Sequence, residues 1–252
     1  MTRTPPALAL EGCGRVWGDR VALRDVTLSL PAGQRVAIAG PSGGGKTTLL
    51  RLLGGALEPS SGVVRADGDD LSRLSVRGLT AHRARCGIVH QHALLVGQLS
   101  VHANVTAGRL GHWSPLRTLA SMVVPQERER TRVLLDRVGL ADRQWDRASE
   151  LSGGQQQRVA IARAMASAPS VILADEPTAS LDPTTAAEVV ELLLRSAEGA
   201  TLVISTHWTS QVLPHVDRLL GIREGQLTLD RPADEVTEGD LDALYAGSRE
   251  RR

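Results

Sequence analysis

Residues 40 to 47 read Gly-Pro-Ser-Gly-Gly-Gly-Lys-Thr, and this octet constrains the fold more than any other part of the chain. It matches the pattern G-x-x-x-x-G-K-[ST] at every fixed position. The glycines allow successive backbone N–H groups to point inward around a phosphate, which larger side chains would obstruct. The short apolar run Arg35–Ala39 precedes the octet, and helical sequence follows at Thr47–Leu53. A buried strand, a glycine loop and a helix in this order begin an α/β unit.

The use of lysine supports the same interpretation. Lys46 is the only lysine among the 29 basic residues of the chain. This position therefore requires a compact ammonium in place of the planar arginine fork. Lys46 is expected to reach the β- and γ-phosphates of a nucleotide, and the Thr47 hydroxyl to ligate Mg²⁺. A glycine-rich turn with an incidental lysine would not explain both flanking elements. The predicted nucleotide-binding residues of this loop are Gly40, Pro41, Ser42, Gly43, Gly44, Gly45, Lys46, Thr47 and Thr48.

A second apolar strand, Val171–Ala174, ends in the carboxylates Asp175 and Glu176. In a protein with a phosphate-binding loop, such a strand carries an aspartate that helps to hold Mg²⁺, here Asp175. Glu176 is then placed to polarise an attacking water as general base. An acidic pair after a strand can instead cap the next helix, but the phosphate loop favours the catalytic interpretation.

The order of elements predicts a single α/β domain with a helical insertion. Helical spacing without a comparable strand extends over 92–165, and buried-strand composition returns at 171–174 and 201–205. We therefore expect a mainly parallel sheet, with an ATP-binding core at 8–91 and 166–230, a helical subdomain at 92–165 and a C-terminal tail at 231–252. Individual elements are predicted as strands at Val21–Leu30 and Gly87–Gln91, helices at Glu127–Val138 and 184–196, and a short helix with a frayed end within Asp230–Arg252.

Composition excludes several classes of protein. The chain is 42% hydrophobic and 23% charged, as is usual for a soluble globular protein, and its net charge of +1 gives no overall attraction to nucleic acid. Met1–Leu10 lacks the apolar core of a secretory signal, and the longest apolar runs are far below the roughly 20 residues that cross a bilayer. A role at a membrane would therefore require a membrane-spanning partner.

Residues Leu151–Arg158 read LSGGQQQR and, with the motifs above, resemble the signature of the ABC ATPase family. Ser152 and the two glycines open a helix, which offers exposed amides to an anion. A serine-capped helix alone would explain Ser152 but not the whole octet. The resemblance implies a P-loop NTPase core with a mainly parallel sheet, an N-terminal antiparallel β subdomain and a helical insertion. It also implies an ATPase that uses ATP and Mg²⁺.

In this family the signature faces the phosphate loop of a second subunit, so that two ATP molecules lie between the subunits of a head-to-tail dimer. By resemblance, Ser152, Gly153 and Gly154 would contact the γ-phosphate bound by the other copy. Hydrolysis would then depend on closure of the dimer.

Four further residues match family positions. Gln91 resembles the glutamine that senses Mg²⁺, takes part in catalysis and faces the membrane partner. His207 resembles the histidine that contacts the γ-phosphate, although a histidine after a buried strand can also be purely structural. Asp182 lies in a segment that resembles the loop between the two sites. Trp17 lies where an aromatic residue, usually tyrosine, stacks on adenine, with a core tryptophan as the alternative.

Three segments resemble the phosphonate-importer branch of the family: His112–Leu119, Ala174–Pro183 and Leu244–Gly247. That branch implies a pair of copies bound to two permease subunits at the cytoplasmic face of the inner membrane, with a separate solute-binding protein. An exporter or lipoprotein-release ATPase would share every catalytic residue. ABC proteins that act on DNA or the ribosome usually carry paired ATPase domains, coiled coils or zinc modules, which this sequence lacks, so no nucleic-acid partner is expected.

Overall fold

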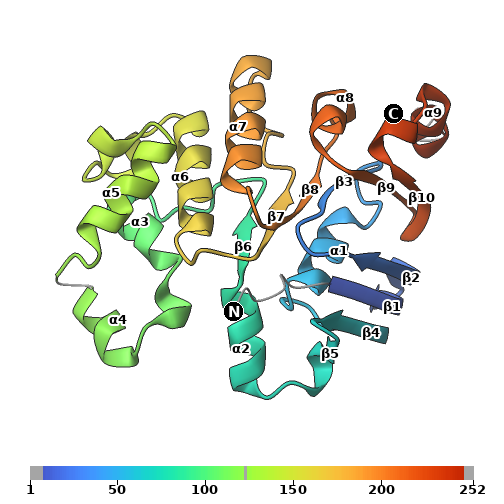
Figure 1. Ribbon diagram of the computed structural model, residues 1–252, viewed down its shortest axis with the longest axis horizontal. Helices are drawn as coiled ribbons and strands as arrows, with labels where there is room; N and C mark the ends of the chain where they lie inside the picture. The colour runs from blue at the N-terminus through green and yellow to red at the C-terminus, as the bar shows by residue number, and fades with distance from the viewer. Residues whose placement is uncertain (1–7, 122–123, 247–252) are drawn as a thin grey trace.

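The protein contains two β-sheets and a helical lobe (Figure 1). The computed structural model describes residues 8–121 and 124–246. An antiparallel sheet has the order β2-β1-β4-β5, and a six-stranded sheet has the order β10-β9-β3-β8-β7-β6. The strands of the first sheet are β1 Leu8–Trp17, β2 Arg20–Leu30, β4 Ser61–Ala66 and β5 Asp69–Asp70. Those of the second are β3 Arg35–Ala39, β6 Cys86–Val89, β7 Val171–Asp175, β8 Thr201–Ser205, β9 Arg218–Arg223 and β10 Gln226–Pro232.

The six-stranded sheet is parallel except at one edge. β3 pairs in parallel with β8 and β9, and β7 pairs in parallel with β8 and β6, whereas β10 is antiparallel to β9. Parallel strands bring their carboxyl ends to one edge of the sheet. The phosphate loop follows β3, the acidic pair ends β7, Gln91 follows β6 and His207 follows β8, so this edge gathers all four predicted motifs.

The helices fall into two groups in Figure 1. One group accompanies the two sheets: α1 Lys46–Leu53, α2 Val76–Ala84, α7 Pro183–Ser196, α8 Thr209–Val212 and α9 Glu238–Tyr245. The other group forms the helical lobe at the left of the view: α3 Val101–Ala107, α4 Pro115–Ser121, α5 Arg128–Arg137 and α6 Gly153–Met165. None of the helices within the described ranges is long and apolar enough to span a bilayer.

Strand β3 is packed on both faces. Val36 and Ile38 belong to the core that the strand shares with α1 and the antiparallel sheet, and Ala37 and Ala39 belong to the core that it shares with α6 and α7. All four side chains are fully buried. The period of two in a strand places alternate residues on opposite faces, so β3 holds the start of the phosphate loop between two cores.

The predicted fold class is confirmed, including the antiparallel subdomain and the helical insertion. Two element predictions differ from the structure. The strand predicted at Gly87–Gln91 occupies Cys86–Val89, so Gln91 lies in the loop beyond the sheet edge. The interpretation of the chain from Asp230 as helix and frayed end is wrong up to Pro232, because β10 continues to that residue. An edge strand tolerates a terminal proline, which lacks the N–H that a neighbouring strand would need. Residues 247–252, where the frayed end was predicted, lie outside the described residues.

Candidate functional site

The loop between β3 and α1 requires glycine for two separate reasons. Gly40 and Gly45 have φ angles of 144° and 118°, which L side chains rarely adopt. A Cβ on Gly40 would also lie 2.0 Å from the carbonyl oxygen of Ile222 on β9, and one on Gly45 would lie 2.8 Å from that of Ala22 on β2. The loop is therefore held between the two sheets, close to the backbone of both.

Lys46, Glu176 and His207 meet at the sheet edge. The Lys46 ammonium, only 4% exposed, lies 3.2 Å from Oε1 of Glu176 and donates to the carbonyl oxygens of Gly40 at 2.8 Å and Pro41 at 3.1 Å. The same Oε1 lies 2.8 Å from Nε2 of His207. Three of the four predicted catalytic residues, Lys46, Glu176 and His207, thus form one contact group, whereas the fourth, Gln91, has no hydrogen bond or ion pair with them in the described part of the chain.

The contacts of Glu176 make its carboxyl group more acidic than usual. The hydrogen bond with His207, together with the positive charge of Lys46, lowers the pKa of Glu176 to about 2, against the opposing effect of burial. Its side chain is therefore a carboxylate at neutral pH. A carboxylate can accept a proton from water, but a pKa this low makes it a weak base as long as it keeps its contacts with His207 and Lys46.

The other carboxylate of the pair has a partner that the sequence did not reveal. The Ser205 hydroxyl at the end of β8 donates to Oδ1 of Asp175 at 2.9 Å and accepts from the backbone N–H of Glu176 at 2.9 Å. Ser205 is fully buried. The available signal was a hydroxyl residue directly after the apolar residues 202–204, but its partners follow only from the register of β7 against β8.

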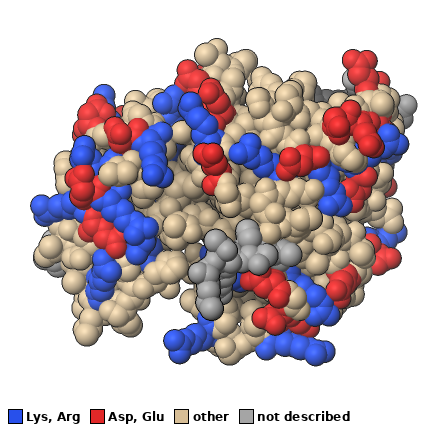
Figure 2. Space-filling model, in the orientation of Figure 1, with Lys and Arg blue, Asp and Glu red and all other residues tan. Residues whose placement is uncertain are grey.

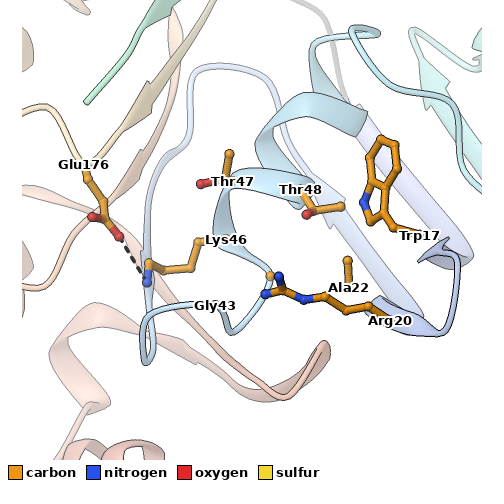
Figure 3. A pocket seen from close by; sticks show the side chains of 9 residues that line it. Trp17, Arg20, Ala22, Gly43, Lys46, Thr47, Thr48 and Glu176 are labelled. Carbon is orange, nitrogen blue, oxygen red and sulfur yellow. Dashed lines mark ion pairs between the residues drawn. The ribbon is translucent and has the colours of Figure 1, made fainter. Parts of the chain in front are cut away.

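A cavity of about 420 Å³ opens beside the phosphate loop (Figure 3). In Figure 3 the Trp17 ring stands at one end, beyond Thr48, and the Lys46–Glu176 ion pair at the other. Trp17 is 49% exposed, so the alternative that it is a core residue is wrong. An aromatic ring at one end and the Lys46 cation at the other suit a ligand with a flat ring and an anionic tail. The lining residues are Trp17, Arg20, Ala22, Gly43, Gly45, Lys46, Thr47, Thr48 and Glu176.

Arg20 and Ala22 are lining residues that the sequence did not identify. The guanidinium of Arg20 points toward the phosphate loop, where a Cβ built on Gly43 would lie 3.4 Å from its Nη2. Arg20 follows Trp17 by only three positions on the neighbouring strand of the β1–β2 hairpin. A basic residue in a hairpin is common, and only the placement of this hairpin against the loop shows that it faces the cavity.

The remaining predicted residues do not line this cavity in the part of the chain that the structure describes. Gln91 is exposed in the loop after β6. Ser152 caps α6 through a reciprocal pair of hydrogen bonds with Gln155, ahead of Gly153 and Gly154. Asp182 caps α7, and the hydrogen bonds from Thr185 lower the pKa of its carboxyl. Both caps are complete within one chain.

Charged side chains give no further indication of a partner. Figure 2 shows acidic and basic residues interspersed over the visible face, with tan surface between them. The mixture agrees with the net charge of +1. No group of three or more His, Cys, Asp or Glu side chains that could hold a metal ion by themselves occurs among the described residues.

Comparison with known proteins agrees with this geometry. The family model described as "ABC transporter" matches residues 23–179. The chain is 51% identical over 244 residues to "Phosphonates import ATP-binding protein PhnC" of Anaeromyxobacter dehalogenans, covering 97% of this chain but 49% of that protein. It is 44% identical over 251 residues to the protein of the same name from Pseudomonas putida, covering 99% and 93%. The chain thus spans about half the length of the first relative.

Two solved structures have the same fold. One is the dimeric post-hydrolysis state of the ATP-binding cassette MJ0796 bound to ADP and Pi, with a TM-score of 0.77 and 31% identity, covering 90% of this chain and 98% of that one. The other is cbiO1 from Clostridium perfringens, part of the transporter complex cbiONQ, with a TM-score of 0.77 and 29% identity, covering 96% of each chain.

Proposed function

Because the chain belongs to the ABC transporter family, we propose that it is the ATP-hydrolysing subunit of an importer for phosphonate or a related phosphorus oxyanion. The observation that carries this proposal is the contact of Lys46, Glu176 and His207 at the end of a cavity that Trp17 bounds on the other side. Two relatives that carry the name phosphonates import ATP-binding protein support the substrate class.

The contact group suits attack of water on a terminal phosphate. The Glu176 carboxylate accepts a proton from water, the water oxygen forms a bond to the γ-phosphorus, and the bond to the β–γ bridging oxygen breaks to release ADP. His207 is placed to hydrogen-bond both the γ-phosphate and the water. Lys46, paired with Glu176 without nucleotide, would exchange this partner for the phosphates and so free the carboxylate for water.

The residues at the sheet edge fit Mg²⁺. Thr47 offers a hydroxyl at the cavity wall, and Asp175 keeps one carboxylate oxygen beyond its bond from Ser205. Mg²⁺ prefers such oxygen ligands and takes few from protein, because water and phosphate complete its shell. Gln91 would approach the ion from the loop after β6. When bound, Mg²⁺ neutralises charge on the phosphates.

The arrangement supports a composite site made by two copies of the chain. Ser152, Gly153 and Gly154 begin α6 in the helical lobe and do not line the cavity of their own chain, as far as the described residues extend. We place them, with Asp182, against the nucleotide of a second copy in a head-to-tail dimer. A dimeric relative of known structure supports this arrangement.

The remaining partners follow from the transporter role. Two copies would bind two permease subunits at the cytoplasmic face of the inner membrane, and a solute-binding protein would deliver the cargo. The core at 8–91 and 166–230 would carry the nucleotide, and residues 92–120 of the helical subdomain at 92–165 would contact the permease. The predicted C-terminal tail at 231–252 would begin only after β10 ends at Pro232.

The base assignment is tested by Glu176→Gln, which keeps the shape of the side chain but cannot accept the proton. We expect ATP binding to be retained and turnover to fall by about a hundredfold or more. The matched control is Glu191→Gln, which neutralises an exposed glutamate on α7. Isothermal titration and phosphate release measure the two properties. Turnover of Glu176→Gln at the normal rate would show that Glu176 is not the base.

The proposed cargo requires a separate measurement. The subunit is assembled with the permease that co-purifies with it and with the cognate solute-binding protein, and ATP turnover is followed with and without an alkylphosphonate. Stimulation by the phosphonate, and none by a sugar or amino acid, is the expected result.

A further inference from the structure

One buried hydroxyl connects the two carboxylate residues of the site. Ser205 ends β8, directly opposite Asp175 in the parallel register with β7. Its Oγ donates to Oδ1 of Asp175 and accepts from the backbone N–H of Glu176, each at 2.9 Å. The hydroxyl thus uses its donor and one of its acceptor positions on adjacent residues of the neighbouring strand.

The backbone at Glu176 needs such support. Its φ angle is +43°, in the left-handed region that non-glycine residues rarely occupy. Backbone of this kind persists only where surrounding contacts fix it. Among residues 8–121 and 124–246, the Glu176 N–H donates only to Ser205, to its hydroxyl and to its carbonyl oxygen at 3.2 Å. The turn lets the Glu176 carboxylate meet Lys46 and His207.

The position of Ser205 in the chain adds a further connection. His207 follows it by two residues, and Thr206 donates its backbone N–H to the carbonyl oxygen of Ile38 on β3 at 3.0 Å. The end of β8 is therefore tied to β3 on one side and to β7 on the other. A shift of this segment would move His207 and the acidic pair relative to each other.

We infer that Ser205 is a positioning residue that sets both carboxylates for the reaction with Mg-ATP. Its hydroxyl fixes one oxygen of Asp175 and leaves the other for the ion, and it fixes the peptide that aims Glu176 at the site of hydrolysis. This inference rests on the proposed ATPase function. Alanine or valine at this position could pack in the strand but could not donate to Asp175.

The test compares Ser205→Ala with Thr201→Val. Thr201 lies on the same strand, is also fully buried, and accepts from the backbone N–H of Gly33 at 2.9 Å, away from the carboxylates. Each variant therefore loses one buried hydroxyl and one accepted hydrogen bond. The affinity for a non-hydrolysable ATP analogue is measured by titration calorimetry with Mg²⁺ and with EDTA, beside the rate of ATP turnover.

For Ser205→Ala we expect the gain in affinity that Mg²⁺ gives to fall about tenfold, and turnover to fall at least as much, while binding in EDTA stays within about twofold of normal. Thr201→Val should keep the full Mg²⁺ effect and normal turnover, even though it lowers the thermal midpoint. Ser205→Cys, with a weak donor of similar size, should also lose most of the Mg²⁺ effect. If the alanine variant does not fold, the Ser205→Cys variant provides the test of the inference.

A normal Mg²⁺ effect and normal turnover in a folded Ser205 variant would overturn the inference, since the hydroxyl would then be structural only. So would an equal loss of the Mg²⁺ effect in Thr201→Val. These results differ from failure of the proposed function, in which the unaltered protein, assembled with its permease, would neither hydrolyse ATP nor respond to Mg²⁺.

Discussion

Two cations of different type face the same cavity. Lys46 is buried and held by carbonyl oxygens of its own loop, whereas Arg20 is exposed and reaches the loop from β2. The geometry of the loop explains why position 46 carries lysine and not arginine. A compact ammonium fits between Gly40, Pro41 and Glu176, where a planar guanidinium would not. Arg20 adds a second positive charge near the position of a bound phosphate chain.

Replacement of Arg20 by glutamine tests that role. Arg20→Gln is expected to lower the binding affinity for ATP and for ADP about fivefold at low salt. The loss should be smaller at high salt, because salt screens an exposed ion pair. Adenosine, which lacks the phosphates, should bind as before. The matched control is Arg24→Gln, which removes the same charge from an exposed position of the same strand. Equal effects of both variants in a titration would show a general charge effect in place of a direct contact.

The phosphate loop depends on neighbouring elements as well as on its own sequence. Strand β9 approaches Gly40 through the carbonyl oxygen of Ile222, and α9 reaches the same residue through Tyr245, whose hydroxyl accepts from the Gly40 N–H at 3.3 Å. Leu244 is buried against Gly221 of β9. The last helix of the described chain therefore supports the start of the loop.

Gly40→Ala should be strongly destabilising for this reason. The new methyl group would meet the Ile222 carbonyl at 2.0 Å, so β9 or the loop must move, and we expect a loss of about 3 kcal/mol in the free energy of unfolding. Gly33→Ala is the control, because Gly33 also has positive φ but open space around it, and about 1 kcal/mol is expected there. Urea denaturation measures both values. Equal losses would mean that backbone conformation, and not the approach of β9, makes glycine necessary.

The two ends of the proposed reaction site lie in different parts of the molecule. The cavity lies between the antiparallel sheet and the phosphate loop, and the capped start of α6 belongs to the helical lobe. Family membership and the dimeric relative make a second copy the natural source of the missing contacts. The whole-molecule prediction is therefore that assembly requires nucleotide.

Ser152→Arg tests this prediction in the Glu176→Gln background, where ATP is expected to stay bound. The long cation should block approach of a second copy, so that light scattering with Mg-ATP finds monomers, whereas the parent variant forms dimers. Nucleotide affinity of the isolated chain should change less than about twofold, because Ser152 does not line its cavity. Undiminished dimer formation would contradict the composite site.

The sequence by itself determined the local chemistry. The octet at 40–47, the acidic pair at the end of β7 and the signature at the start of α6 are each contiguous in the sequence, and the octet and the signature also carry the glycines and the cap that their backbone needs. The strand predicted before the loop and the helix predicted after it are both present, as β3 and α1, because each is specified by its own contiguous residues. Trp17, which the family resemblance assigned to adenine stacking, is exposed and lines the cavity.

Tertiary structure alone decided which side chains meet. The bond of Ser205 to Asp175, the approach of Arg20 to Gly43 and the contact of His207 with Glu176 join segments that are far apart in the chain. Such contacts depend on the order and register of parallel strands and on how the two sheets pack. Because hydrophobic strands of similar length can pair in several orders, local sequence does not specify the pairing, and only the packed core selects one.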